Sequence, residues 1–290
     1  ARSVARQRHD RNRGQALAEV KAKVSRATRQ RIDAATDEKL EDLEAKFRER
    51  VQAPLEQLAL SAEPVEMYTS EQRAVMRLLM AGEQQLSAHT PRPSAPSDSL
   101  ISVQAHQSAL NNALAGLGLA GREMTAVELY DFFAKKVPGG ASPPPAELSE
   151  RARIEFARHD AIRVAYHNGR IELILSIAEL ARGRDRIRNF DVHAFYVPQI
   201  DGLRVDLVRD GTLQFAGSRL RTGPRVVLHS VFGKLLHKAT KVPVLAEGLE
   251  SDPRFAGLMV TQLVIDDGWL AVALGPEQPA RVAWRTRPTH

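Results

Sequence analysis

The sequence feature that most constrains the fold is an alternation of apolar and polar residues that begins after Ser149. Ile154 and Phe156 flank Glu155, and similar two-residue spacing recurs in segments as far as Phe215. A period of two places every second side chain on the same face of a strand, so each such segment has one apolar and one polar face. The pattern predicts an antiparallel sheet with one apolar face toward the core and one polar face toward solvent.

Short turn signals separate these alternating segments. Asn-Gly and Asp-Gly pairs favour tight hairpins because both turn positions accept a positive φ. We therefore predict an up-and-down meander with strands around residues 154–156, 162–166, 171–177, 192–196, 203–207, 213–215, 258–265 and 269–274, with turns at Asn168-Gly169, Asp201-Gly202, Asp210-Gly211 and Asp266-Asp267-Gly268.

The N-terminal part of the chain has a helical period instead. From Gln15 to Ala53 apolar residues recur every three or four positions among good helix formers, and Pro54 marks an interruption. The apolar stripe loses its register around Ile32 to Thr36. A coiled coil, packing on the chain's own body and packing on a partner subunit all remain open.

The middle of the sequence mixes both periods. Residues 70–81 alternate as a strand would, although Thr69 and Gln72 have the spacing of a helix-capping box; we favour a strand. A strand is predicted from Leu100 to Ala105, with helices at 108–117 and 127–136 and a helix or apolar segment at 226–236. Together these elements predict an α+β fold: an N-terminal helix, then a curved antiparallel meander packed over one or two helices.

Composition divides the chain into three regions. Residues 1–60 form a basic helical arm, 61–280 an α+β body, and 281–290 a tail. A Gly- and Pro-rich stretch at 138–149 is either a long loop in the body or a linker.

The positive charge is concentrated at the start of the chain. Residues 1–31 hold ten Lys or Arg against Asp10 and Glu19, a net charge of +8, so the other residues carry −2 of the overall +6. A solvated arm is the simplest interpretation, and a surface for anionic lipid is the next. Nucleic acid is disfavoured because the arm has no aromatic residue for base stacking. The candidate anionic-surface residues are Arg2, Arg6, Arg8, Arg11, Arg13, Lys21, Lys23 and Arg26.

No catalytic constellation is found. The absence of cysteine excludes disulfides and thiolate metal sites, and no nucleophile and base can be paired. Gly116–Gly121 matches the spacing GxGxxG, but these glycines follow a helical run rather than precede a helix, which argues against a dinucleotide. Asp266-Asp267 is explained better by a hairpin turn than by a cation site. We predict no enzyme activity, no cofactor and no metal.

Apolar content offers one candidate binding feature. A curved sheet wrapped over helices either closes on a filled core or leaves an apolar channel. Core filling is the simpler interpretation. The residues that would line a channel or fill the core are Leu110, Leu114, Leu117, Leu129, Phe132, Phe133, Ile171, Leu173 and Leu175.

The order of elements resembles that of the tubular lipid-binding (TULIP) superfamily, which includes the bactericidal/permeability-increasing proteins. The resemblance is carried by the strand-to-helix passage from Ile101 to Leu114, the meander from Ile154 to Phe215, and the closing segment Ile265 to Leu270. It covers residues 65–275 and implies a twisted antiparallel sheet that wraps a helix and cradles lipid chains. The basic N-terminal helix departs from the family pattern.

Three functions follow as hypotheses. The first is a non-enzymatic envelope protein, in the cell envelope or periplasm rather than the cytoplasm, that binds an apolar ligand or lipid surface. The second is a structural or assembly protein whose N-terminal helix mediates protein contacts, including homo-oligomers, without a ligand. The third, nucleic-acid binding by the basic arm, is disfavoured.

Overall fold

A computed structural model describes residues 2–56, 60–82, 85, 90–136, 148, 152–217, 222–238, 240–245 and 248–276. The chain divides into two compact units, residues 1–57 and 58–290. The expected Gly- and Pro-rich loop or linker at 138–149 falls outside the described residues except for Leu148, and the tail at 281–290 lies wholly outside them.

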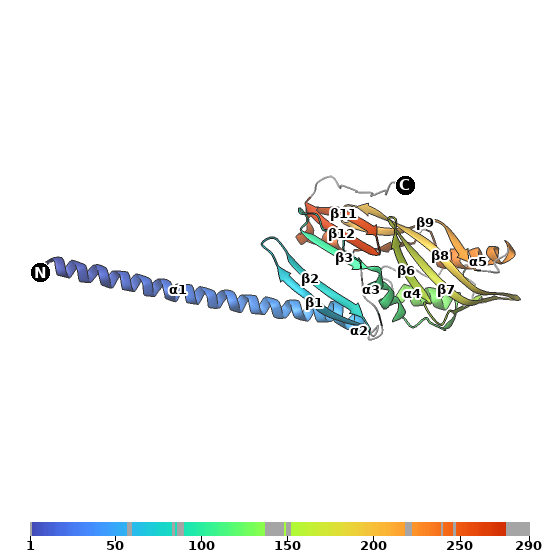
Figure 1. Ribbon diagram of the computed structural model, residues 1–290, viewed down its shortest axis with the longest axis horizontal. Coiled ribbons are helices and arrows are strands. Elements are labelled where there is room, and N and C mark those ends of the chain that lie inside the picture. The colour runs from blue at the N-terminus through green and yellow to red at the C-terminus, as the bar shows by residue number, and fades with distance from the viewer. Residues whose placement is uncertain are drawn as a thin grey trace. The chain divides into compact units, whose positions relative to one another are not determined.

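The first unit is helical. Helix α1 spans Arg2–Phe47, a π-helical turn spans Arg48–Gln52, and α2 spans Ala53–Glu56 (Figure 1). The predicted interruption at Pro54 takes the form of a change in hydrogen bonding rather than a break in the helical conformation, because α1 ends at Phe47 and a π-helical turn precedes the proline. The hydrogen bonding widens just before the proline, and the Ala53 N–H donates to the carbonyl of Arg48. Widening relieves the clash that a proline ring makes with the preceding helical turn.

The second unit begins with a hairpin. Strand β1 (Ser61–Thr69) pairs antiparallel with β2 (Ala74–Ala81), so the strand favoured for residues 70–81 is confirmed from Ala74 onward. Strand β3 (Ile101–His106) then leads into helix α3 (Gln107–Ala115). The short strand β4 (Glu123–Thr125) leads into α4 (Ala126–Lys136), as the capping spacing of Thr125 and Glu128 predicts.

A seven-stranded antiparallel sheet follows, and it curls as a half-barrel. Its strands are β5 (Ala152–Phe156), β6 (Ile162–His167), β7 (Arg170–Arg182), β8 (Asp185–Asp201), β9 (Arg204–Ala216), β10 (Lys241–Pro243) and β4, in the order β10-β9-β8-β7-β5-β4 with β6 also on β7. The predicted α+β fold with an antiparallel meander is therefore confirmed (Figure 1).

One predicted turn is wrong. Asp210-Gly211 does not join two strands but lies inside β9, where the pairing with β8 shifts by two residues between Phe195–Asp210 and His193–Gln214. Gly211 has φ +67°, which an irregularity in a strand needs as much as a hairpin does. The Asp-Gly pair therefore identifies the local backbone conformation without identifying a chain reversal.

A separate three-stranded sheet joins distant parts of the chain. Strands β11 (Leu258–Asp266) and β12 (Trp269–Pro276) form the predicted final hairpin, and β12 also pairs with β3. Its turn meets the other sheet, because the Gly268 N–H donates to the Tyr166 carbonyl and the Gln107 N–H donates to the Gly268 carbonyl. These bonds fix β3, α3 and β6 to one another.

Helices α4 and α5 (Thr222–Leu235) cover one face of the large sheet (Figure 1). Leu129 of α4 and Leu228 and Phe232 of α5 pack on the apolar face that alternation predicts for β5, β7 and β8. The Phe232 ring lies 6.1 Å from Phe190 and 6.3 Å from Phe215, centroid to centroid. The interior of the half-barrel is thus filled by helices at these positions.

Candidate functional site

The apolar residues chosen from the sequence mostly lie in the core. Leu129, Ile171 and Leu175 are buried. Leu110 is the one exception among the nine chosen positions, since more than a third of it is exposed. The others are partly buried against the two core clusters of the large sheet: Leu114, Leu117, Phe132, Phe133 and Leu173.

The basic residues chosen from the sequence all lie on α1. Lys21, Lys23 and Arg26 are exposed there. The structure does not describe the side chains of the remaining five, Arg2, Arg6, Arg8, Arg11 and Arg13.

A surface that sequence analysis did not identify lies on the β1–β2 hairpin and on β3 with the start of α3. Eleven large apolar side chains after residue 58 are described as exposed, and nine of them belong to two short segments. We call these nine the hairpin–β3 surface: Val65, Met67, Tyr68, Met76, Leu79, Leu100, Ile101, Val103 and Leu110. On the hairpin they lie on both faces, because Met67 pairs with Met76 whereas Tyr68 and Leu79 are an odd number of positions away along their strands. A contiguous exposed apolar patch is typical of a binding surface.

The exposure on β3 follows from its place at a sheet edge. Ile101 pairs with Leu274 and Val103 with Val272 on β12, and paired residues point to the same face. Leu274 and Val272 are buried in a core cluster, whereas Ile101 is 40% and Val103 is 59% exposed. The inner face of the three-stranded sheet therefore continues beyond its covered part onto an uncovered strand.

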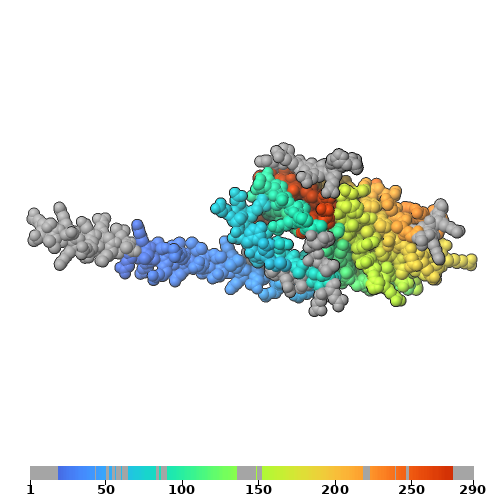
Figure 2. Space-filling view, in the orientation of Figure 1, coloured from blue at the N-terminus to red at the C-terminus, as the bar shows by residue number. Residues whose placement is uncertain are grey.

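The hairpin is held beside β3 at both of its ends. At the end near its turn, the Arg73 guanidinium donates to the Pro96 carbonyl and to Ser99 Oγ, 3.2 Å away, just before β3. At the other end, the Asn112 side-chain amide of α3 donates to the Met80 carbonyl at 3.0 Å. Figure 2 shows an opening between the hairpin and the three-stranded sheet, so the tethered ends border a hollow.

The side chains of the hairpin suit an irregular apolar ligand. Three of the five methionines in the sequence, Met67, Met76 and Met80, belong to β1 and β2. Methionine is unbranched and flexible, so it adapts to ligands without a fixed shape. Arg77 is ion-paired with Glu66 at 3.0 Å, which leaves the paired charge compensated within the hairpin.

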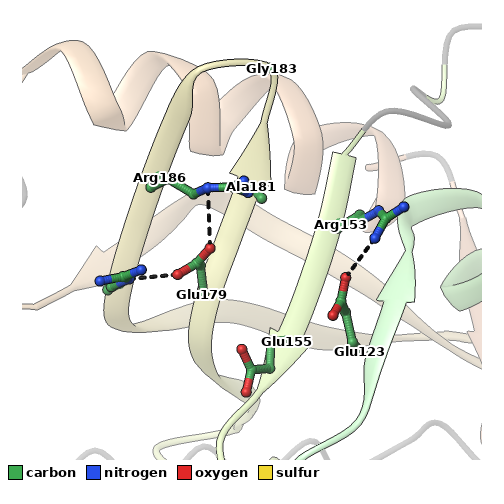
Figure 3. Close-up of a pocket in the computed structure, with 8 residues that line it drawn as sticks. Glu123, Arg153, Glu155, Glu179, Ala181, Gly183 and Arg186 are labelled. Atoms are coloured by element: carbon green, nitrogen blue, oxygen red, sulfur yellow. Dashed lines mark hydrogen bonds and ion pairs between the residues drawn. The ribbon is translucent and has the colours of Figure 1, made fainter.

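A second hollow, of about 500 Å³, lies on the polar face of the large sheet (Figure 3). Three carboxylates, Glu123, Glu155 and Glu179, stand opposite one another on neighbouring strands β4, β5 and β7. Arg153 pairs with Glu123 at 3.3 Å, and Glu179 accepts from Arg188 at 2.5 Å and lies 3.5 Å from Arg186. The guanidinium groups thus compensate the row of like charges, which would otherwise destabilise the sheet.

A second polar cluster joins β6, β7 and β8 on the same face of the sheet. His193 Nδ1 lies 2.6 Å from Glu172 Oε1, and His167 Nε2 lies 3.6 Å from Glu172 Oε2. The two rings approach different oxygens of one carboxylate. Among the residues that the structure describes, no group of three His, Cys, Asp or Glu is arranged to hold a metal ion.

Two tyrosines have raised pKa values, and both pack against the core rather than at a binding surface: Tyr166 is buried and Tyr196 is partly buried. Burial raises the pKa of Tyr166 to about 12. Burial also raises the pKa of Tyr196, while the charge of Arg209 opposes that rise. Neither shift indicates acid–base chemistry, because these rings are packing groups.

The glycines of the GxGxxG match follow a helix, as the sequence context predicts. Helix α3 ends at Ala115, and Gly118 and Gly121 take positive φ in the turn that leads to β4. They terminate a helix instead of opening one.

The fold and its surfaces define a class of protein, an α+β protein whose curled antiparallel sheet is filled by helices and which presents an uncovered apolar surface at a sheet edge. Neither models of known protein families nor curated protein sequences match the chain. No helix in the described part of the chain is both long enough and apolar enough to span a bilayer.

Proposed function

We propose that this protein binds lipid without catalysing a reaction, and that the hairpin–β3 surface receives the acyl chains. The observation that carries the proposal is the uncovered inner face of β3, where Ile101 and Val103 extend the apolar face of the three-stranded sheet into solvent. Leaving such a strand uncovered exposes the protein to aggregation, so a resident ligand has a stabilising role.

Three further features support an acyl chain as the occupant. The surface borders a hollow rather than a flat face (Figure 2), as a narrow, flexible chain requires. Methionines line the hairpin, and the cation Arg77 on β2 is already paired. The resemblance to tubular lipid-binding proteins gives the same ligand class, although it places lipid inside the sheet, where helices α4 and α5 fill the space here.

The test uses phosphatidylcholine vesicles that contain a phospholipid with a fluorescent acyl chain. We expect the protein to take up the probe, and native mass spectra of the purified protein to show bound lipid. Val103→Glu places a charge in the acyl-chain path and should weaken uptake at least about tenfold, because burying an unpaired charge is costly. Val226→Glu is the matched control, since Val226 on α5 is equally accessible at 67% exposed and lies outside the hairpin–β3 surface.

Unchanged uptake by Val103→Glu, with Val226→Glu behaving like the wild type, would contradict the proposal. Absence of both uptake and bound lipid in the wild-type protein would contradict it as well. Circular dichroism and thermal unfolding of both variants show whether a loss of uptake reflects a loss of folding.

A second candidate function is assembly through α1. Every residue described from Glu19 to Asp42 is exposed, including Val20, Val24, Ile32 and Leu40. A long helix gains most of its stability from packing an apolar face on a neighbour. We therefore infer that α1 pairs with another copy of the chain, on the side that carries Val20 and Val24.

A further inference from the structure

We propose that the hollow beside β9 and β10 is a second binding site, which takes a small amphipathic anion: a carboxylate or phosphate group with a short apolar tail. The hollow has a volume of about 380 Å³ and lies between these two strands and the turn at Gly248–Glu250. It is independent of the hairpin–β3 surface, and the proposal does not rest on lipid uptake there.

The charged side of this hollow is organised around Asp206. Its carboxylate is almost completely buried, although the side chains of Arg204 and Lys241 around it are more than half exposed. Arg204 Nε donates to Asp206 Oδ2 at 2.8 Å, and Lys241 Nζ lies 3.8 Å from the same oxygen. One buried oxygen therefore holds two cations at the mouth of the hollow.

This arrangement leaves donors for a ligand. The bond to Asp206 uses only Nε of Arg204, and its two terminal nitrogens have no other partner among the described residues. A guanidinium edge binds carboxylate or phosphate oxygens with two parallel hydrogen bonds, and an ammonium adds a third donor. Asp206 acts as a positioning residue, because its contact fixes the direction of the guanidinium.

The other side of the hollow is apolar and accounts for the tail. Its wall is formed by Leu203, Val205, Pro243, Leu245 and Leu249. Leu203 and Val205 belong to the buried cluster beneath the three-stranded sheet, so this wall rests on a packed core. A pocket with apolar walls and a few convergent polar groups is the usual form of a small-molecule site.

The backbone conformation at Gly248 positions the rim of the hollow. Gly248 has φ +87°, in the left-handed region, and opens the short 3-10 helix Leu249–Ser251, whose Leu249 and Glu250 line the hollow. Glu250 is exposed and carries the opposite charge to Arg204, so it weakens the attraction for an anion. Water screens that exposed charge more than it screens the buried Asp206 contact.

The hollow of Figure 3 fits an anion less well. Arg153, Arg186 and Arg188 there are paired with Glu123 or Glu179, and Glu155 adds another carboxylate. Ala181 and Gly183 offer little apolar wall for a tail. Of these two hollows, the one between β9 and β10 combines an oriented guanidinium edge with an apolar wall.

Isothermal titration calorimetry of the full chain tests the proposal with four probes: octyl phosphate, octanoate, 1-octanol and inorganic phosphate. We expect the two amphipathic anions to bind, with affinity that falls as salt is added, and the other two probes to bind at least about tenfold more weakly. Preference for octyl phosphate over octanoate, or the reverse, identifies which anionic group the site takes.

Two variants carry opposite expectations. Arg204→Gln should weaken binding of whichever anion, octyl phosphate or octanoate, binds more tightly to the wild type. We expect a loss of at least about tenfold, since the change removes the charged guanidinium group. Glu250→Gln should strengthen binding of the same anion by about two- to threefold at low salt, because an exposed opposing charge is worth a few tenths of a kilocalorie to one kilocalorie. Arg188→Gln, which changes an equally exposed arginine in the Figure 3 hollow, should have no effect.

Equal binding of 1-octanol and octyl phosphate, or unaltered binding in Arg204→Gln, would overturn the proposal. The two proposals can be contradicted independently of each other. Val103→Glu should leave octyl phosphate binding unchanged, and Arg204→Gln should leave uptake of the fluorescent phospholipid unchanged.

Discussion

At the scale of the residue, Tyr166 links stability to alkaline pH. Its ring is buried among Val164, Ile171 and Ile265, and burial raises its pKa from 10.0 to about 12. The neutral phenol is favoured in the folded state, so this contribution is complete below pH 10 and is lost as the pH rises from 10 to 12.

We predict that Tyr166→Phe loses less stability than the wild type between pH 9 and pH 12, by roughly 2 kcal/mol, which is most of the ~3 kcal/mol that the full pKa shift represents. Urea unfolding followed by circular dichroism at several pH values measures it. Tyr196 remains in the variant and retains part of the alkaline loss, because burial raises its pKa too. Identical pH profiles for the two proteins would contradict the prediction.

Single residues also show where sequence analysis reaches its limit. Asn168 and Gly169 take the positive φ values expected, and they do form a hairpin turn between β6 and β7. Gly211 takes a positive φ as well, yet β9 continues through it. The two cases share one local conformation, and only the register of the neighbouring strand β8 distinguishes a bulge from a reversal.

At the scale of the element, α4 has a complete capping box. The Thr125 N–H donates to Glu128 Oε2 at 2.7 Å, and the Glu128 N–H donates to Thr125 Oγ1 at 3.2 Å. The hydrogen bond from the Thr125 backbone, followed by that from its hydroxyl, lowers the pKa of Glu128. Because a lowered carboxyl pKa favours folding when the group is ionised, this contribution is present above the ordinary value of 4.5 and is lost as the pH falls below it.

We predict that Thr125→Ala lowers the free energy of unfolding by about 1 kcal/mol, the usual value for removing an N-cap hydroxyl. Thr125→Ser keeps the hydroxyl and should stay close to the wild type. Chemical denaturation at pH 7 measures both variants, and an equal loss in both would show that the methyl packing of Thr125 matters rather than its cap.

Elements with strong local signals are predicted well from the sequence, whereas their partners are not. The period of two gives β5 to β8, and the period of three to four gives α3, α4 and α5. Alternation also shows that β3 has an apolar face, with Ile101 and Val103 on it. That this face is uncovered depends on β3 being at the edge of a sheet formed with β12, a pairing between distant segments that no local pattern specifies.

Contacts between distant segments also explain why the candidate sites could not be placed from the sequence. Of the residues predicted to line an apolar channel, Leu129 and Leu175 lie in the core where α4 and α5 pack against the sheet. Ile171 is buried in a different cluster, with Val164, Tyr166 and Ile265. Asp206 looks in sequence like any polar residue of an alternating strand. Its burial beside Arg204 and Lys241 arises from the loop that brings β10 against β9.

At the scale of the whole molecule, the two compact units give separate expectations for α1 and for the body. If α1 pairs through Val20 and Val24, the double change Val20→Glu with Val24→Glu should convert an oligomer to a monomer in sedimentation velocity, because four charges would meet across a dimer contact. Lipid uptake by the body should persist.

The control for this prediction changes two residues on the opposite side of the helix. Ala22→Glu with Ser25→Glu alters the net charge by the same amount and should leave the oligomer intact, since these positions are rotated away from Val20 and Val24. A wild-type chain that sediments as a monomer at tens of micromolar, or equal dissociation in both double variants, would contradict pairing through this side.

The pairing of β3 with β12 has a consequence for biosynthesis. β3 ends at His106 and the strand that completes its sheet begins at Trp269, so translation at about 5–20 residues per second leaves β3 waiting on the order of ten seconds for its neighbour. Throughout that interval the backbone edge of β3 that will pair with β12 is open to other nascent chains on the same messenger. Slowed elongation over the codons between those for β3 and β12 should therefore lower the yield of native protein more than the same delay before the codons for β3.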